Sequence, residues 1–77
     1  MESFEPKKLA LIRIWQILKD YSDFDHPLTQ EDIAVKLQNE YGIVLERKAI
    51  SRNISLLKEA GIDIESRRAG SYLEYRD

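Results

Sequence analysis

Apolar residues recur every three or four positions in three segments of the chain, a spacing that predicts three amphipathic helices. The first helix is expected over residues 6–21, because Pro6 suits a first helical turn. Its apolar arc contains Ala10, Leu11, Ile14, Trp15, Ile17, Leu18 and Tyr21. Trp15 and Tyr21 are therefore expected to lie in the core.

A second helix is expected over residues 29–41, after a loop that contains His26 and Pro27. Thr29 is a good N-cap residue, and the acid three positions later, Asp32, resembles the partner in a capping box. Gly42 suits the position just after the helix. The apolar face of this helix contains Ile33, Ala34, Leu37 and Tyr41.

A third helix is expected over residues 47–60, with Ile50, Ile54 and Leu57 as its buried stripe. The β-prone residues 43–45 before it predict one minimal strand. Residues 62–65 and 72–75 alternate between apolar and polar, and the basic turn between them contains Gly70. This pattern predicts a β-hairpin over residues 62–75.

The order of these elements predicts an α+β fold, a winged helix-turn-helix with three helices and a small antiparallel hairpin as the wing. The 77 residues are expected to form a single domain, 1–77. The sequence has no apolar run of membrane-spanning length, no signal peptide and no cysteine, so a cytoplasmic protein is expected.

Charge is distributed unevenly along a chain whose net charge is −2. Residues 1–45 carry 5 basic and 8 acidic groups, whereas residues 47–68 carry 6 basic and 3 acidic groups. Burial of the third helix's apolar stripe turns four residues outward together, with no carboxylate among them: Lys48, Ser51, Arg52 and Ser55. Arginine, lysine and serine are suited to contacts with base edges and phosphates in the major groove.

Three phrases of the sequence, HPLTQEDI, YGIVLERKAISRNI and GIDIE, resemble the N-terminal winged helix of the WYL-domain (DeoR-like) bacterial transcription regulators. The similarity covers about residues 8–75. It implies a DNA-binding domain whose third helix is the recognition helix. Glu46 departs from the family's usual capping aspartate, and glutamate caps a helix poorly.

Family members normally continue into a ligand-sensing WYL domain, so the chain is expected to be either an excised DNA-binding domain or a small stand-alone relative. Two aliphatic residues, Leu9 and Ile12, fall on the polar side of the first helix. They are either ordinary exposed aliphatics or a contact with a second copy or with the missing sensing domain.

The sequence therefore predicts a sequence-specific binder of double-stranded DNA, with no cofactor, metal or enzymatic activity. Base-facing positions are Arg47, Lys48, Ser51, Arg52 and Ser55. Phosphate-facing positions are Thr29 and Gln30 at the start of the second helix and Arg67 and Arg68 at the wing tip. His26 is expected to be a turn residue, and Asn53 to bond to neighbouring backbone. The alternative function is a winged helix that binds another protein.

Overall fold

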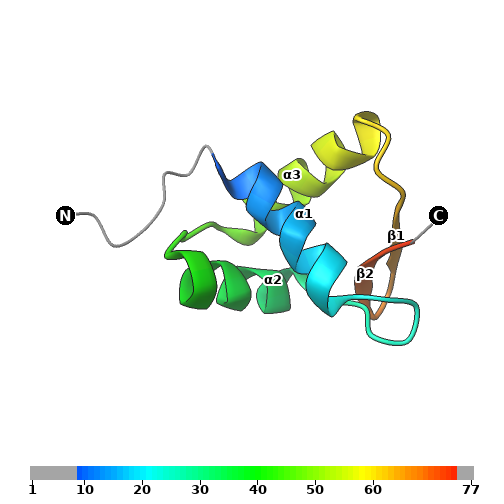
Figure 1. Ribbon diagram of the computed structural model, residues 1–77, viewed down its shortest axis with the longest axis horizontal. Coiled ribbons are helices and arrows are strands. Elements are labelled where there is room, and N and C mark those ends of the chain that lie inside the picture. The colour runs from blue at the N-terminus through cyan, green and yellow to red at the C-terminus, as the bar shows by residue number, and fades with distance from the viewer. Residues whose placement is uncertain (1–8, 75–77) are drawn as a thin grey trace.

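The computed structural model describes residues 9–74. Its first helix, α1 (Ala10–Tyr21), crosses the third helix and also packs against the second helical segment (Figure 1). It is followed by α2 (Gln30–Lys36), which continues into a π-helical turn, η2 (Leu37–Tyr41), and by α3 (Arg47–Glu59). The strands β1 (Ile64–Arg67) and β2 (Gly70–Leu73) form an antiparallel hairpin. This is the α+β arrangement of a winged helix-turn-helix. Pro6 and Tyr75, the predicted ends of the first helix and the hairpin, lie outside the described residues.

The core lies where the apolar stripes of the helices meet. The most deeply buried large side chains are Ile14, Ile17, Leu18, Ile33, Leu37, Ile43 and Ile50. Burying such a side chain contributes about 1.5–3 kcal/mol, so this cluster sets the relative positions of the helices. The predicted stripe of the third helix is confirmed, since Ile50, Ile54 and Leu57 are all buried.

Thr29 begins α2 with both bonds of a capping box, as predicted. Its hydroxyl accepts a hydrogen bond from the Asp32 amide at 3.0 Å, and its own amide donates to Asp32 Oδ2 at 3.0 Å. The predicted helix over 29–41 is continuous, but its last turn has widened into η2. Gly42, at φ 68°, then ends the helix in the left-handed conformation that glycine adopts most readily.

The short strand predicted at residues 43–45 is wrong. Ile43 is buried in the core, Val44 is exposed to solvent, and residues 43–45 form no strand. The hairpin instead gains a neighbour from the loop before α2, where Leu28 pairs with Ser71 through two backbone hydrogen bonds of 2.8 and 2.7 Å. Since Leu28 occupies this edge of β2, residues 43–45 cannot pair with it.

Tyr21 is also not in the core, contrary to the prediction. It lies at the last residue of α1 with 43% of its surface exposed, and its hydroxyl donates to Glu40 Oε2 at 2.7 Å. The ammonium of Lys36 sits 3.8 Å from its ring centre. The apolar arc of α1 extends beyond the core at its C-terminal end, so the phenol of Tyr21 lies at the surface and contacts polar groups. Trp15 is half-buried and packs against the core.

Candidate nucleic-acid interface

An open depression of about 380 Å³ lies on the outer face of α3 and is called here the α3 depression. Its lining residues are Gln30, Arg47, Lys48, Ser51, Arg52 and Ser55. All five residues predicted to face bases are thus brought together. They are joined by one residue, Gln30, that the sequence assigned to phosphate contact.

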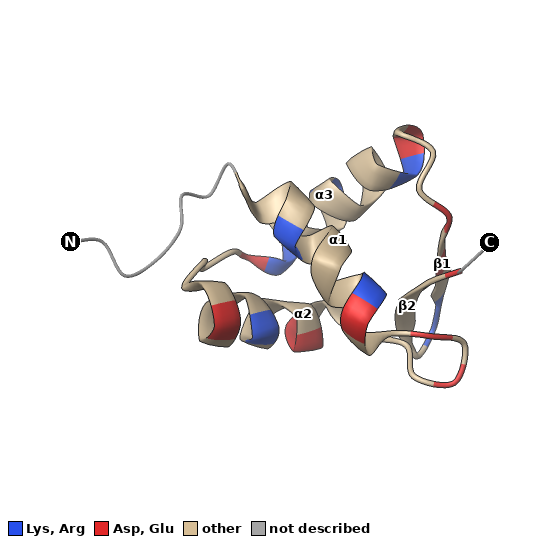
Figure 2. Ribbon diagram, in the orientation of Figure 1, with Lys and Arg blue, Asp and Glu red and all other residues tan. Residues whose placement is uncertain are grey.

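The α3 depression is cationic because of how α3 is oriented. Ile50, Ile54 and Leu57 fix the inner face of the helix, which leaves the residues between them facing out. Within Arg47–Glu59 the only carboxylate is Glu59 at the last position, whereas acidic residues are spread over α2, the loop after α1 and the hairpin (Figure 2). The depression therefore has three cations and no acid in its lining.

Gln30 joins α2 to α3. Its side-chain amide Nε2 donates a hydrogen bond to Ser51 Oγ. One amide hydrogen and the carbonyl oxygen of Gln30 remain for other partners, since a glutamine side chain offers two donors and one acceptor. This contact holds the first residue of α2 beside the middle of the α3 depression, a convergence that sequence spacing cannot reveal.

Glu46 is the N-cap residue of α3 and makes no side-chain capping bond, as expected for glutamate. Asn53 turns back and donates from Nδ2 to the Ala49 carbonyl at 2.7 Å, which agrees with the prediction. Thr29 does not line the depression, and its hydroxyl and amide are both engaged in the capping box.

The two wing arginines have different surroundings. Arg67 donates from Nη2 to the Phe24 carbonyl at 2.6 Å, and its guanidinium lies 4.6 Å from the Phe24 ring and 5.1 Å from the Tyr72 ring. Arg68 is exposed in the turn between the strands. Neither lines the α3 depression, so the structure separates the wing positions from the helix positions.

His26 forms a turn with Asp23, as predicted, and the pair is exposed. Asp23 Oδ1 accepts from the amides of Asp25 and His26 and lies 2.9 Å from His26 Nδ1. The contact with His26 holds the pKa of Asp23 below its ordinary value. Of the two aliphatic residues predicted to form a contact on the first helix, Ile12 is half-exposed and Leu9 is partly buried.

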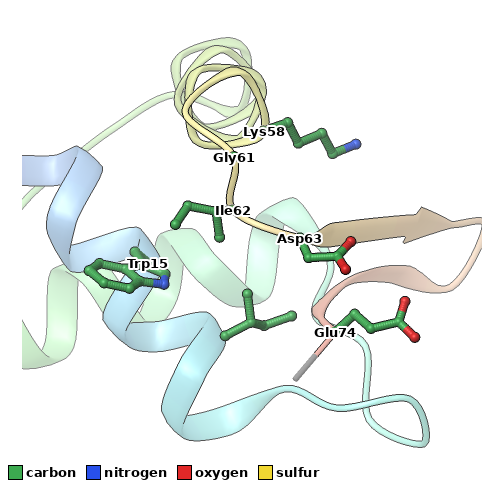
Figure 3. A pocket seen from close by; sticks show the side chains of 7 residues that line it. Trp15, Lys58, Gly61, Ile62, Asp63 and Glu74 are labelled. Atoms are coloured by element: carbon green, nitrogen blue, oxygen red, sulfur yellow. The ribbon is translucent and has the colours of Figure 1, made fainter. Parts of the chain in front are cut away.

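A second hollow, of about 610 Å³, lies between α1, the end of α3 and the hairpin. Trp15, Ile62 and Leu73 form its apolar side. The carboxylates of Asp63 and Glu74 point away from the Trp15 ring (Figure 3), and the Lys58 ammonium donates to Ser66 at 3.1 Å. No polar group therefore faces the apolar side of the hollow, so the hollow lacks the polar set of a ligand site.

One acidic group in the described part of the chain has ligand atoms within 4.8 Å of one another and could hold a hard cation: Asp63, Glu65 and Glu74. It lies at the open end of the hairpin, and none of its members lines the α3 depression. Among residues 9–74, no helix is both long and apolar enough to cross a membrane.

Comparison of the chain with protein-family models, with curated proteins and with solved structures found no match. The likeness to the WYL-domain regulators therefore rests on the three phrases of the sequence, and the function that it implies stays a prediction.

Proposed function

We propose that this protein is a sequence-specific, double-stranded DNA-binding domain of a cytoplasmic transcription regulator, with α3 as the helix that enters the major groove. The observation that carries the proposal is the α3 depression, where three cations, two serines and one glutamine converge without a carboxylate. Each of these side-chain types has a known pairing with a base edge or a phosphate.

The dimensions of α3 suit this task. Its 13 residues correspond to about 20 Å of helix at about 1.5 Å per residue. A major groove about 12 Å wide admits one α-helix. Ser51 and Ser55 are short, so the helix backbone between them can approach the base edges closely while the longer cations reach to either side.

Each lining residue takes a role that follows from its chemistry. Arg52, on the exposed face of α3, is assigned the bidentate contact with a guanine. Arg47 and Lys48, at the start of the helix, contact guanine or phosphate. Ser51 and Gln30 act as a pair, because the hydrogen bond between them fixes the Gln30 amide for a base or phosphate at the edge of the groove.

The small net charge of −2 favours a selective binder over a coat protein. Nonspecific affinity depends on many phosphate contacts. A domain with few cations and a net negative charge gains less free energy of binding from phosphate contacts. Base contacts then account for a larger share of its free energy of binding. Acidic residues on the other surfaces also disfavour binding in other orientations.

The proposal is tested by selecting bound sequences from a random pool of duplexes and repeating the selection with Arg52→Ala. The wild type is expected to enrich one motif. Arg52→Ala is expected to weaken binding to that motif by about 1–3 kcal/mol and to relax the preference at one base position. Lys19→Ala is the matched control, because it removes one exposed cation from α1, outside the α3 depression.

Failure to enrich any motif would remove the sequence-specific part of the proposal. Equal weakening by Arg52→Ala and Lys19→Ala would show that only total charge matters. If no duplex is bound at all, the winged helix that binds another protein becomes the leading function.

A further inference from the structure

The guanidinium of Arg67 is held between the hairpin and the loop that follows α1. It donates to the Phe24 carbonyl at 2.6 Å and stacks near the rings of Phe24 and Tyr72. These two rings also meet edge to face, with their centres 5.8 Å apart. Phe24, Arg67 and Tyr72 are called here the Arg67 clamp.

The Arg67 clamp is one part of a longer contact between the loop after α1 (residues 22–29) and the hairpin, called here the seam. The backbone amides of Leu28 and Ser71 each donate to the other residue's carbonyl, and the Leu73 amide donates to Ser22 Oγ at 3.0 Å. The loop thus runs beside β2 on the side opposite β1, as the chain path in Figure 1 also shows. Tyr72 and Arg67 lie on the same face of the hairpin, because Tyr72 pairs with Glu65, two residues before Arg67.

We infer that Arg67 is a positioning residue that fixes the wing against the loop, and that Arg68 is the wing cation that contacts a phosphate. The second half of this inference rests on the proposed function. Arginine is suited to the first role because its planar group stacks on rings and donates several hydrogen bonds at once. A wing fixed in advance loses little conformational freedom on binding, which favours affinity.

The charges around the two arginines agree with this division. Phe24 is flanked in the chain by Asp23 and Asp25, both exposed. A phosphate that approached the clamp would approach these two carboxylates as well, and like charges repel. Arg68 lies in the turn of the hairpin, beyond the residues that pair with β2, and takes no part in the clamp's stacking contacts.

The first arm of the test measures the clamp without DNA. Hydrogen exchange of the Leu28 and Ser71 amides is compared by NMR in the wild type, Arg67→Ala, Arg67→Lys, Phe24→Ala and Arg68→Ala. Loss of the stacking contacts, accompanied in Arg67→Ala by loss of the bond to the Phe24 carbonyl, is expected to make exchange about five- to tenfold faster in Arg67→Ala, Arg67→Lys and Phe24→Ala. Arg67→Lys keeps the charge but not the planar group, so it should not rescue protection. Arg68→Ala should exchange like the wild type.

The second arm measures the salt dependence of duplex affinity for the same variants. Arg68→Ala is expected to reduce the log–log slope by about 0.9, the value for one lost phosphate contact. Arg67→Ala and Phe24→Ala should weaken binding to a similar extent and leave the slope unchanged. Phe24→Ala is the decisive variant, because it removes the ring contacts of Phe24 with Arg67 and Tyr72 without altering any charge.

Two results would overturn the inference. One is wild-type exchange rates at Leu28 and Ser71 in both Arg67→Ala and Phe24→Ala. The other is a slope reduced by Arg67→Ala together with no effect of Phe24→Ala, which would make Arg67 a direct phosphate contact. If the wild type bound no duplex, the proposed function and the role of Arg68 would fail, while the exchange arm would still decide whether Arg67 positions the wing.

Discussion

Replacement of Gly70 by alanine tests whether the wing is fastened to the loop as tightly as the structure indicates. Gly70 opens β2 at φ 141°, and a Cβ atom there would lie 2.5 Å from the Leu28 oxygen and 2.9 Å from the Thr29 nitrogen. Both are backbone atoms on the other side of the seam. The loop can give way only by breaking the pairing between Leu28 and Ser71.

The magnitude follows from two separate costs. A side chain at this φ costs about 1–3 kcal/mol in backbone strain. The collision, or the hydrogen bonds lost to relieve it, adds about 1–3 kcal/mol. Together these make about 2–6 kcal/mol, a large part of the 4–12 kcal/mol that about 0.05–0.15 kcal/mol per residue implies for 77 residues.

Gly61→Ala is the matched control. Gly61 also has a positive φ, 98°, but an added Cβ would have nothing within 4 Å. Gly61→Ala is therefore expected to lose stability through backbone strain alone, with no collision. Urea unfolding of both variants, followed by the fluorescence of the single tryptophan, Trp15, should place Gly70→Ala below Gly61→Ala by about 1–3 kcal/mol. Equal losses in the two variants would refute the close contact between wing and loop.

Two further predictions concern single contacts. Thr29→Ala should lower the free energy of unfolding by about 1 kcal/mol, because the capping box is lost, while Thr29→Ser should keep most of it; urea unfolding measures both. The hydrogen bond from Tyr21 to the Glu40 carboxylate raises the pKa of Tyr21 above its ordinary value of 10.0, so its stabilising contribution is complete below pH 10.0 and is lost as the pH rises through the raised pKa. Phenolate absorbance, with Tyr21→Phe to assign the signal, should show a lower pKa in Glu40→Gln, and an unchanged pKa would exclude this contact.

The helices and the hairpin could be predicted from the sequence because their signals are local. The spacing of Ile50, Ile54 and Leu57 defines the inner face of α3, and Thr29 with Asp32 marks the start of α2. The same spacing also defines the outer face of α3, so the α3 residues that line the α3 depression could be named from the sequence.

The features that could not be predicted depend on residues far apart in the chain. Arg67 reaches Phe24 across 43 positions, and Gln30 reaches Ser51 across 21. Residues 43–45 have the local propensity of a strand, yet Leu28 occupies the free edge of the hairpin instead. Propensity describes which conformations a segment tolerates, whereas strand pairing depends on which backbone segment lies along the edge of the hairpin in the folded chain.

The salt dependence of wild-type affinity for its selected duplex tests the central claim most directly. If Arg68 and one or both of Arg47 and Lys48 neutralise phosphates, two or three in all, the slope of log affinity against log salt should lie at about −1.8 to −2.7. A random duplex should bind more weakly at every salt concentration. A slope near zero, or equal affinity for the selected and the random duplex, would contradict the account of α3 as a helix that reads DNA.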